Sequence, residues 1–135
     1  MLTSLAFTSG QFWVLAQNFL RERNGQLPIH AITKLVDLPV GGSVTFDYPG
    51  PNEPRVLVRL DEQNLVAYGQ QCTHLSCPVI VQAEAGQLHC PCHEGLFDLA
   101  SGRPLAGPPR RPLPRVTLEL RDGVIYATGV EERTV

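Results

Sequence analysis

Two short segments of the chain hold most of its metal-binding side chains. The segments 72–77 (CTHLSC) and 90–93 (CPCH) contain all four cysteines and two of the four histidines in the 135-residue sequence. Thiolate and imidazole are ligands that proteins offer to zinc, copper and iron. Each segment supplies both kinds of donor within a few residues, so together they indicate a metal centre. We name 72–77 the first box and 90–93 the second box.

The combination of donors favours an iron–sulfur centre. In a 2Fe–2S centre each iron needs two protein ligands, and in one class of these centres two His replace two Cys on one iron. Imidazole is neutral where thiolate is negative, so the His-bound iron is easier to reduce. Four-coordinate zinc is the non-redox alternative, and a scaffold of two disulfides would leave the box histidines without a role. Electron transfer is therefore the leading hypothesis, and we expect no metal ligand at His30 or His89.

The overall composition is that of one small globular domain. The hydrophobic fraction of 43% and the charged fraction of 18% are ordinary for a folded protein. A chain of 135 residues can bury one core but is too short for two ordinary domains. The net charge of −2 gives no indication of nucleic-acid binding. Twelve glycines and twelve prolines favour short strands joined by turns over a helical bundle.

The hydrophobic pattern predicts an all-β, antiparallel domain. We expect strands at 31–36, 43–48, 56–60, 65–69, 79–81, 87–89, 115–120 and 124–128. Polar or Gly-containing turns at 61–64, 84–86 and 121–123 separate neighbouring strands, and 48–54 reads as a rigid proline-rich loop. The hairpin 79–89 lies between the two boxes. The boxes are therefore expected on a pair of loops inserted into the β domain, which we place at 29–130.

The N-terminal segment is different, because residues 1–20 contain no charge and Arg21-Glu22-Arg23 follows. Its length is near that of a membrane span, but eight polar residues or glycines dilute it. Neither a positively charged n-region nor an arginine pair precedes the apolar stretch, as a secretory or twin-arginine signal would require. We expect residues 1–25 to form a helix that docks on a partner subunit. A membrane anchor and a helix packed on the domain itself are the alternatives.

The boxes resemble the two cluster-binding boxes of Rieske proteins of the cytochrome bc and arsenite-oxidase types, and the resemblance extends over about 29–129. It implies a small antiparallel Rieske-type β sandwich with an inserted cluster-binding subdomain and one 2Fe–2S cluster. The ligands that it implies are Cys72, His74, Cys90 and His93. It also implies a disulfide between Cys77 and Cys92, which ties the two loops together and which oxygenase-type Rieske domains lack.

The resemblance extends to residues around the expected cluster. Gly107-Pro108-Pro109 is similar to the proline loop that covers a Rieske cluster from a third side. Leu75, inside the first box, is also expected to lie near the cluster. These residues are expected to shield the cluster rather than to bind it.

The chain departs from the quinol-oxidising branch of the family after the second box. That branch usually continues with Gly, Ser, a variable residue and Tyr, whereas this chain has Glu94-Gly95-Leu96-Phe97. The two hydroxyls that bond cluster sulfurs in that branch are therefore missing at Gly95 and Phe97. Fewer hydrogen bonds to sulfur, and a carboxylate at Glu94, disfavour the reduced cluster. We expect a potential in the middle or lower part of the Rieske range.

This departure favours an electron-relay subunit of a larger oxidoreductase complex, rather than an enzyme that acts alone. The expected partner is a redox protein or a larger subunit. The alternative is a membrane-anchored, quinol-oxidising subunit of a cytochrome bc-type complex, with quinone and membrane as partners. A ferredoxin for an oxygenase is a third reading, which the disulfide disfavours. The disulfide favours the periplasm or the outer membrane face, with the cytoplasm as the alternative.

Overall fold

The computed structural model describes residues 2–71, 77–92, 94–107, 109 and 111–131, and for residues 2–11 the backbone alone. Several of the predicted site residues lie outside the described residues: Cys72, His74, Leu75, His93 and Pro108. The remaining predicted site residues are all described, and they include both cysteines of the expected disulfide.

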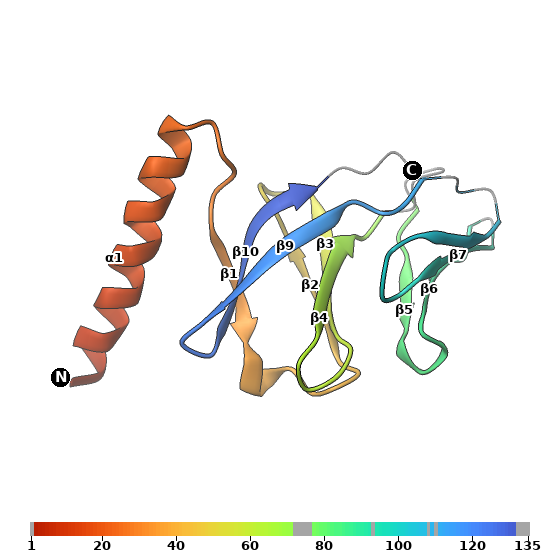
Figure 1. Ribbon diagram of the computed structural model, residues 1–135, viewed down its shortest axis with the longest axis horizontal. Helices are drawn as coiled ribbons and strands as arrows, with labels where there is room; N and C mark the ends of the chain where they lie inside the picture. The colour runs from red at the N-terminus through yellow and green to blue at the C-terminus, as the bar shows by residue number, and fades with distance from the viewer. Residues whose placement is uncertain (1, 72–76, 93, 108, 110, 132–135) are drawn as a thin grey trace.

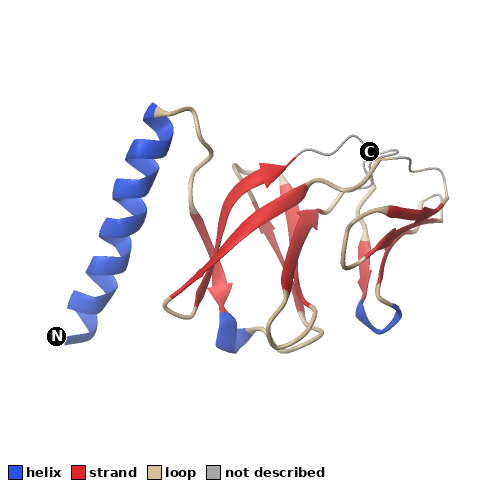
Figure 2. Ribbon diagram, in the orientation of Figure 1, coloured by secondary structure: helices blue, strands red, loops and turns tan. Residues whose placement is uncertain are grey.

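A single helix, α1 (Leu2–Arg23), precedes two antiparallel sheets (Figures 1 and 2). The first sheet has the order β1-β10-β9-β4-β3-β2. Its strands are β1 (His30–Lys34), β2 (Ser43–Asp47), β3 (Pro54–Arg59), β4 (Leu65–Gly69), β9 (Arg115–Arg121) and β10 (Val124–Glu131). Two short 3₁₀ turns, η1 (Leu35–Asp37) and η2 (Ala83–Ala85), also occur.

The second sheet is smaller and has the order β5-β6-β7-β8. Its strands are β5 (Ile80–Gln82), β6 (Gln87–Cys90), β7 (Gly95–Asp98) and β8 (Pro104–Ala106). It is inserted between β4 and β9 of the first sheet and lies at the opposite end of the molecule from α1 (Figure 1). The prediction of an antiparallel β domain with an inserted pair of loops and an N-terminal helix is therefore confirmed.

Two details of the strand prediction were wrong. β7 and β8 were not predicted, because they are three or four residues long and begin with Gly and Pro, which usually mark turns. Pro54 was assigned to a loop but begins β3, where it pairs with Asp47. Proline is tolerated as the first residue of a strand because its missing N–H is not needed for the ladder there.

The buried side chains form two cores, and β3 and β4 contribute to both. Leu57 and Ala67 face the core of the first sheet, whereas their neighbours Val56, Val58 and Tyr68 face the second sheet. Successive residues of a strand point to opposite faces, so these two strands are covered on both sides. The core between the sheets contains Val56, Val58, Tyr68, Val79, Leu88, Cys90, Phe97, Leu99 and Leu113.

This shared core holds the inserted sheet against the main one. The hydroxyl of the fully buried Tyr68 donates a hydrogen bond to the carbonyl of Leu99, just beyond β7, at 2.8 Å. A buried hydroxyl needs such a partner, because leaving it unpaired is costly. The inserted sheet is therefore a packed part of the domain rather than a separate unit.

The segment between α1 and β1 is fastened to the main sheet by Tyr48. This side chain is fully buried, and its hydroxyl donates to the carbonyl of Pro28 at 2.6 Å. Burial raises the pKa of Tyr48 above its ordinary value. Over the described residues, no helix combines the length and the hydropathy needed to cross a bilayer.

Tyr48 should make the stability of the protein depend on alkaline pH. In the unfolded chain the Tyr48 phenol ionises near pH 10. In the folded protein its pKa is raised, so the phenol keeps its proton to higher pH. The contribution of Tyr48 is thus complete below about pH 10 and is lost as pH rises further. Urea unfolding of Tyr48→Phe should show a loss of about 1 kcal/mol at neutral pH and a smaller loss at alkaline pH. An equal loss at both pH values would contradict this prediction.

Candidate metal centre

The residues that flank the first box are paired with each other through the backbone. Gln71 and Pro78, which flank it, form an antiparallel bridge. The N–H of Val79 donates to the carbonyl of Gln70 at 2.8 Å, one step further out. The chain on either side of the first box is thus paired, between the end of β4 in the main sheet and the start of β5 in the inserted sheet.

The second box begins at the end of β6, where the β6–β7 hairpin closes. Cys90 pairs with Gly95 across this hairpin, and the Cys90 side chain is only 1% exposed. Glu94 adopts a left-handed backbone conformation with φ of 56°, in the place where the family pattern has Gly. Such a conformation costs a non-Gly residue roughly 1 kcal/mol. The tight turn of the hairpin, rather than the residue type, therefore dictates the backbone here.

A disulfide between Cys77 and Cys92 joins the two boxes. Their Cα atoms are 6.4 Å apart, and 15 residues separate them along the chain. The predicted disulfide is therefore confirmed. It links Cys77, the last residue of the first box, to Cys92 in the second box, so these two points of the boxes are held together.

The proline loop packs directly against the second box. Gly107 has φ of 89°, and a Cβ placed on it would lie 2.8 Å from the Glu94 carbonyl oxygen and 2.9 Å from the Gly95 Cα. A Cβ at Gly95 would in turn lie 2.9 Å from Cγ of the buried Pro109. Real Cβ contacts are not this short, so both positions require glycine. Gly107 thus meets the backbone of Glu94 and Gly95, and the Pro109 side chain fills the space beside Gly95.

Phe97 lies behind the second box in the core. It pairs with Leu88, is fully buried, and belongs to the same core cluster as Cys90. Cys90 and Phe97 are two residues apart in register on one face of the hairpin, which makes them diagonal neighbours. The predicted residues that the structure describes are therefore brought together: Cys77, Cys90, Cys92, Gly95, Phe97, Gly107 and Pro109.

An interaction at the edge of the second box was not predicted. His89 was expected to be a surface or packing residue, and its half-buried ring places Nε2 3.1 Å from Oε2 of the exposed Glu94. His89 lies in β6, one residue before Cys90, and Glu94 is the last residue of the β6–β7 turn. The hairpin register could have indicated this pair, but the sequence pattern did not define where the turn ends.

The described residues fit a thiolate-ligated cluster. Cys90 is the described cysteine that remains outside a disulfide, and it is buried at the base of the hairpin that the disulfide fastens to the first box. A thiolate ligand needs such a shielded place, because the surroundings of a metal centre control its solvent access. The described residues alone contain no group of three or more possible metal ligands, since three of the four expected ligands lie outside them.

Comparison with known proteins identifies the family. The model of the Rieske [2Fe-2S] domain matches residues 30–117, which include both boxes and the proline loop. The chain belongs to the Rieske [2Fe-2S] domain family. It is a Rieske electron-transfer protein, and its domain is of the kind that binds a single 2Fe–2S cluster.

Several relatives share this domain. Iodate reductase subunit IdrB of Pseudomonas sp. (strain SCT) is 31% identical over 96% of this chain and 70% of its own length. The cytochrome bc1 complex Rieske iron-sulfur subunit of Streptomyces lividans is 37% identical over 54% of this chain and 45% of its own. Carotenoid phi-ring synthase of Chlorobaculum tepidum is 48% identical over 45% of this chain, a match that spans only 9% of that protein.

A solved structure shows the same fold. The ferredoxin of carbazole 1,9a-dioxygenase from Nocardioides aromaticivorans IC177 superposes with a TM-score of 0.61 at 25% identity. The match covers 74% of this chain and 98% of the ferredoxin. Almost the whole of that ferredoxin therefore superposes on this chain.

Removal of the disulfide should weaken the site without abolishing it. Cys77→Ser opens a 15-residue loop, which in the chain-entropy view costs about 3 kcal/mol. We expect the variant to bind iron but to lose thermal stability and to release its cluster faster. Thermal unfolding and the decay of visible absorbance measure the two effects. Unchanged stability and cluster lifetime would show that the bridge does not support the site.

The contact between the proline loop and the second box can be tested with two glycines. Gly107→Ala and Gly86→Ala both place a side chain at positive φ, but Gly86 has open space around its Cα. Both variants should lose about 1 kcal/mol from backbone strain. Only Gly107→Ala should also shorten the cluster lifetime, because it pushes the loop off Glu94 and Gly95. Equal cluster lifetimes in the two variants would contradict the role given to this contact.

Proposed function

We propose that this chain is an electron-relay subunit of a larger oxidoreductase complex, in which Cys72, His74, Cys90 and His93 hold the 2Fe–2S cluster. The observation that carries the proposal is the disulfide between Cys77 and Cys92, which holds the two boxes side by side. Each box offers one further Cys and one His. Fixing the boxes relative to each other therefore also fixes two thiolates and two imidazoles.

The pairing of these donors follows the Rieske pattern, in which two His replace two Cys on one iron. Cys72 and Cys90 would bind one iron, and His74 and His93 the other. Cys90 is buried at the base of the hairpin, which supports a thiolate-bound iron on the inner side. The histidines would then lie toward the outer side, where a redox partner has access to their ring edges. Such a cluster accepts and releases one electron when bound.

The surroundings of Gly95 support a relay role over quinol oxidation. The quinol-oxidising branch has a Ser at this position, and its hydroxyl stabilises the reduced cluster. Here Pro109 occupies the space that a Cβ at position 95 would need. The packing of the proline loop therefore excludes a Ser at this position and, with it, the hydrogen bond that its hydroxyl would make. The potential should accordingly be lower than in a centre that has both hydroxyls.

The similarity to IdrB supports the subunit role, because it extends over nearly the whole chain. The alternative is a quinol-oxidising subunit, which the similarity to the bc1 Rieske subunit favours. That match covers about half of this chain, and Gly95 and Phe97 lack the two hydroxyls of the quinol-oxidising pattern. A structural disulfide is stable mainly in oxidising compartments. We therefore place the protein in the periplasm or at the outer face of a membrane.

A potentiometric titration of the purified protein across pH separates these functions. A relay subunit should show a middle or low Rieske potential that changes little near neutral pH. A high potential that falls as pH rises through neutrality would indicate that the ligand imidazoles release protons on oxidation. This second result would support quinol oxidation and contradict the proposal. The reduced and oxidised forms can be followed by visible absorption and low-temperature EPR.

Restoring one missing hydroxyl should raise the potential. In Phe97→Tyr the added hydroxyl can donate to a cluster sulfur, and a differential hydrogen bond of about 1 kcal/mol corresponds to roughly 40 mV for one electron. Phe46→Tyr, which adds the same group in the core of the main sheet, serves as the control and should not shift the potential. If Phe97→Tyr leaves the potential unchanged, the missing hydroxyl does not explain it.

A further inference from the structure

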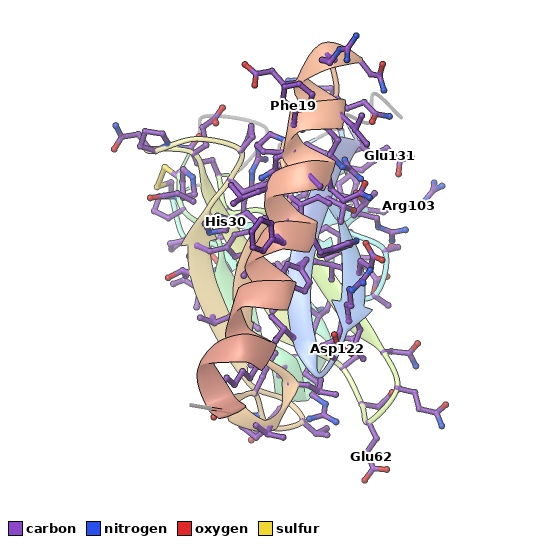
Figure 3. All side chains as sticks on the ribbon, turned by 90° about the vertical axis from the view of Figure 1, so that its left-hand side faces the viewer. Phe19, His30, Glu62, Arg103, Asp122 and Glu131 are labelled. Atoms are coloured by element: carbon purple, nitrogen blue, oxygen red, sulfur yellow. A yellow bond between two sulfur atoms is a disulfide. The ribbon has the colours of Figure 1, made fainter. Side chains whose placement is uncertain are left out.

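α1 turns an apolar face to solvent. Phe12 is 70% exposed, Leu15 67%, Phe19 61% and Leu20 50%. Ala16 lies among them and is also exposed. The spacing i, i+3, i+4, i+7 and i+8 places all five on one side of a helix. We name this set the outer helix face; Figure 3 views the molecule from this side and labels Phe19.

Two polar side chains of α1, those of Asn18 and Arg21, bond to the backbone of the segment after the helix and of the domain. The Ile29 N–H donates to Oδ1 of Asn18 at 2.6 Å, and Asn18 Nδ2 donates to the Ile29 carbonyl at 3.3 Å. Arg21 Nη1 donates to the carbonyls of Thr128 at 2.8 Å and of Leu27 at 3.2 Å. Polar contacts therefore help to hold this side of α1 against the domain, while the outer helix face stays exposed.

Aromatic contacts fix the rotation of the helix about its axis. The ring of Trp13 meets Tyr126 of β10 edge-on, with ring centroids 5.4 Å apart. The guanidinium of Arg121, at the end of β9, lies 4.0 Å from the centroid of the same Trp13 ring. Rolling α1 to bury the outer helix face would break these contacts and the hydrogen bonds of Asn18 and Arg21. The apolar side is therefore held outward by specific contacts.

We propose that the outer helix face docks into an apolar groove on another polypeptide of the same oxidoreductase complex. This inference rests on the proposed function and names how the chain is attached. Anchors at i, i+3, i+4 and i+7 are the pattern by which a helix is held in a groove. α1 and the inserted sheet lie at opposite ends of the molecule (Figure 1). Docking through α1 therefore leaves the cluster end open to a redox partner.

Some of the similar proteins match α1 as well as the β domain, whereas others match only the β domain. The match to IdrB, a protein named as a subunit, covers 96% of this chain and so must include most of α1. The family model begins only at residue 30. The ferredoxin match uses 98% of the ferredoxin but only 74% of this chain, a share similar in length to the β domain alone. The match to a named subunit includes α1, while the match to the ferredoxin does not require it. This difference supports a role of α1 in attachment to a complex.

A protein groove fits the outer helix face better than a lipid surface. Helices that lie in a membrane interface carry Lys and Arg along their polar face. α1 has no charged residue before Arg21, and Arg21 is bonded to the backbone of the domain. A second copy is also a poor occupant, because two convex helices would bury few residues compared with the roughly 20–30 a side of a stable interface. A groove encloses more of the helix.

Photocrosslinking on the full-length, cluster-loaded chain tests the proposal. A benzoyl-phenylalanine side chain is placed at Phe12 or Phe19 and, as the control, at Val36, an 86% exposed apolar residue on η1. In cells that make the complex, positions 12 and 19 should yield the same adduct, and position 36 should not. The second polypeptide, identified by mass spectrometry, should oxidise or reduce the cluster of this chain when both are purified. An adduct between two copies of this chain, or none, would overturn the proposal.

Charge insertion gives an independent readout. The double variant Phe12→Glu/Phe19→Glu should lower the yield of the co-purified partner about tenfold or more, whereas Val36→Glu should not. Neither variant should change the cluster spectrum or potential. Flotation with phosphatidylcholine–phosphatidylglycerol vesicles should leave the wild-type chain unbound, and binding that the double variant abolishes would overturn the proposal in favour of lipid. Absence of a cluster in the wild-type chain would instead contradict the proposed function, so the two failures are distinguishable.

Discussion

The covalent bond between Cys77 and Cys92 is the constraint on which the site depends. The first box falls between β4 and β5 in the sequence, and the second begins at the end of β6. The residues flanking each box have their own backbone pairing, Gln71 with Pro78 and Cys90 with Gly95, but that pairing does not fix the distance between the boxes. The disulfide fixes the distance between Cys77 and Cys92. The buried core that contains Cys90 and Phe97 packs beneath the second box. A cluster with ligands from both boxes needs this double support, because its geometry tolerates little movement.

A second contact, between Gly95 and Pro109, links the packing of the site to its chemistry. The proline loop can cover the second box only because Gly95 and Gly107 have no side chains. The same absence removes a hydrogen-bond donor that would stabilise the reduced cluster. Shielding of the second box and the expected lower potential would thus both follow from the same close contact. This is why the proline loop bears on the proposed relay role as well as on the stability of the centre.

The chemistry of the site was easier to predict from the sequence than its surroundings. The donors stand close together in two boxes, so their types and spacing are visible without a structure. The disulfide followed from the family resemblance and was confirmed. The short strands β7 and β8 were missed because Gly and Pro begin them. The orientation of α1 was also not predictable, because Arg21 bonds to a backbone carbonyl of Thr128, 107 residues away.

An apolar helix face thus lies at one end of the molecule, and the disulfide between the two boxes lies at the other. The central claim is that two cysteines and two histidines of these boxes hold one 2Fe–2S cluster. Mössbauer spectroscopy of the reduced, iron-enriched protein tests it most directly. The account predicts two inequivalent irons, with the added electron on the iron that has nitrogen ligands. Two equivalent irons, or zinc in place of iron, would contradict it.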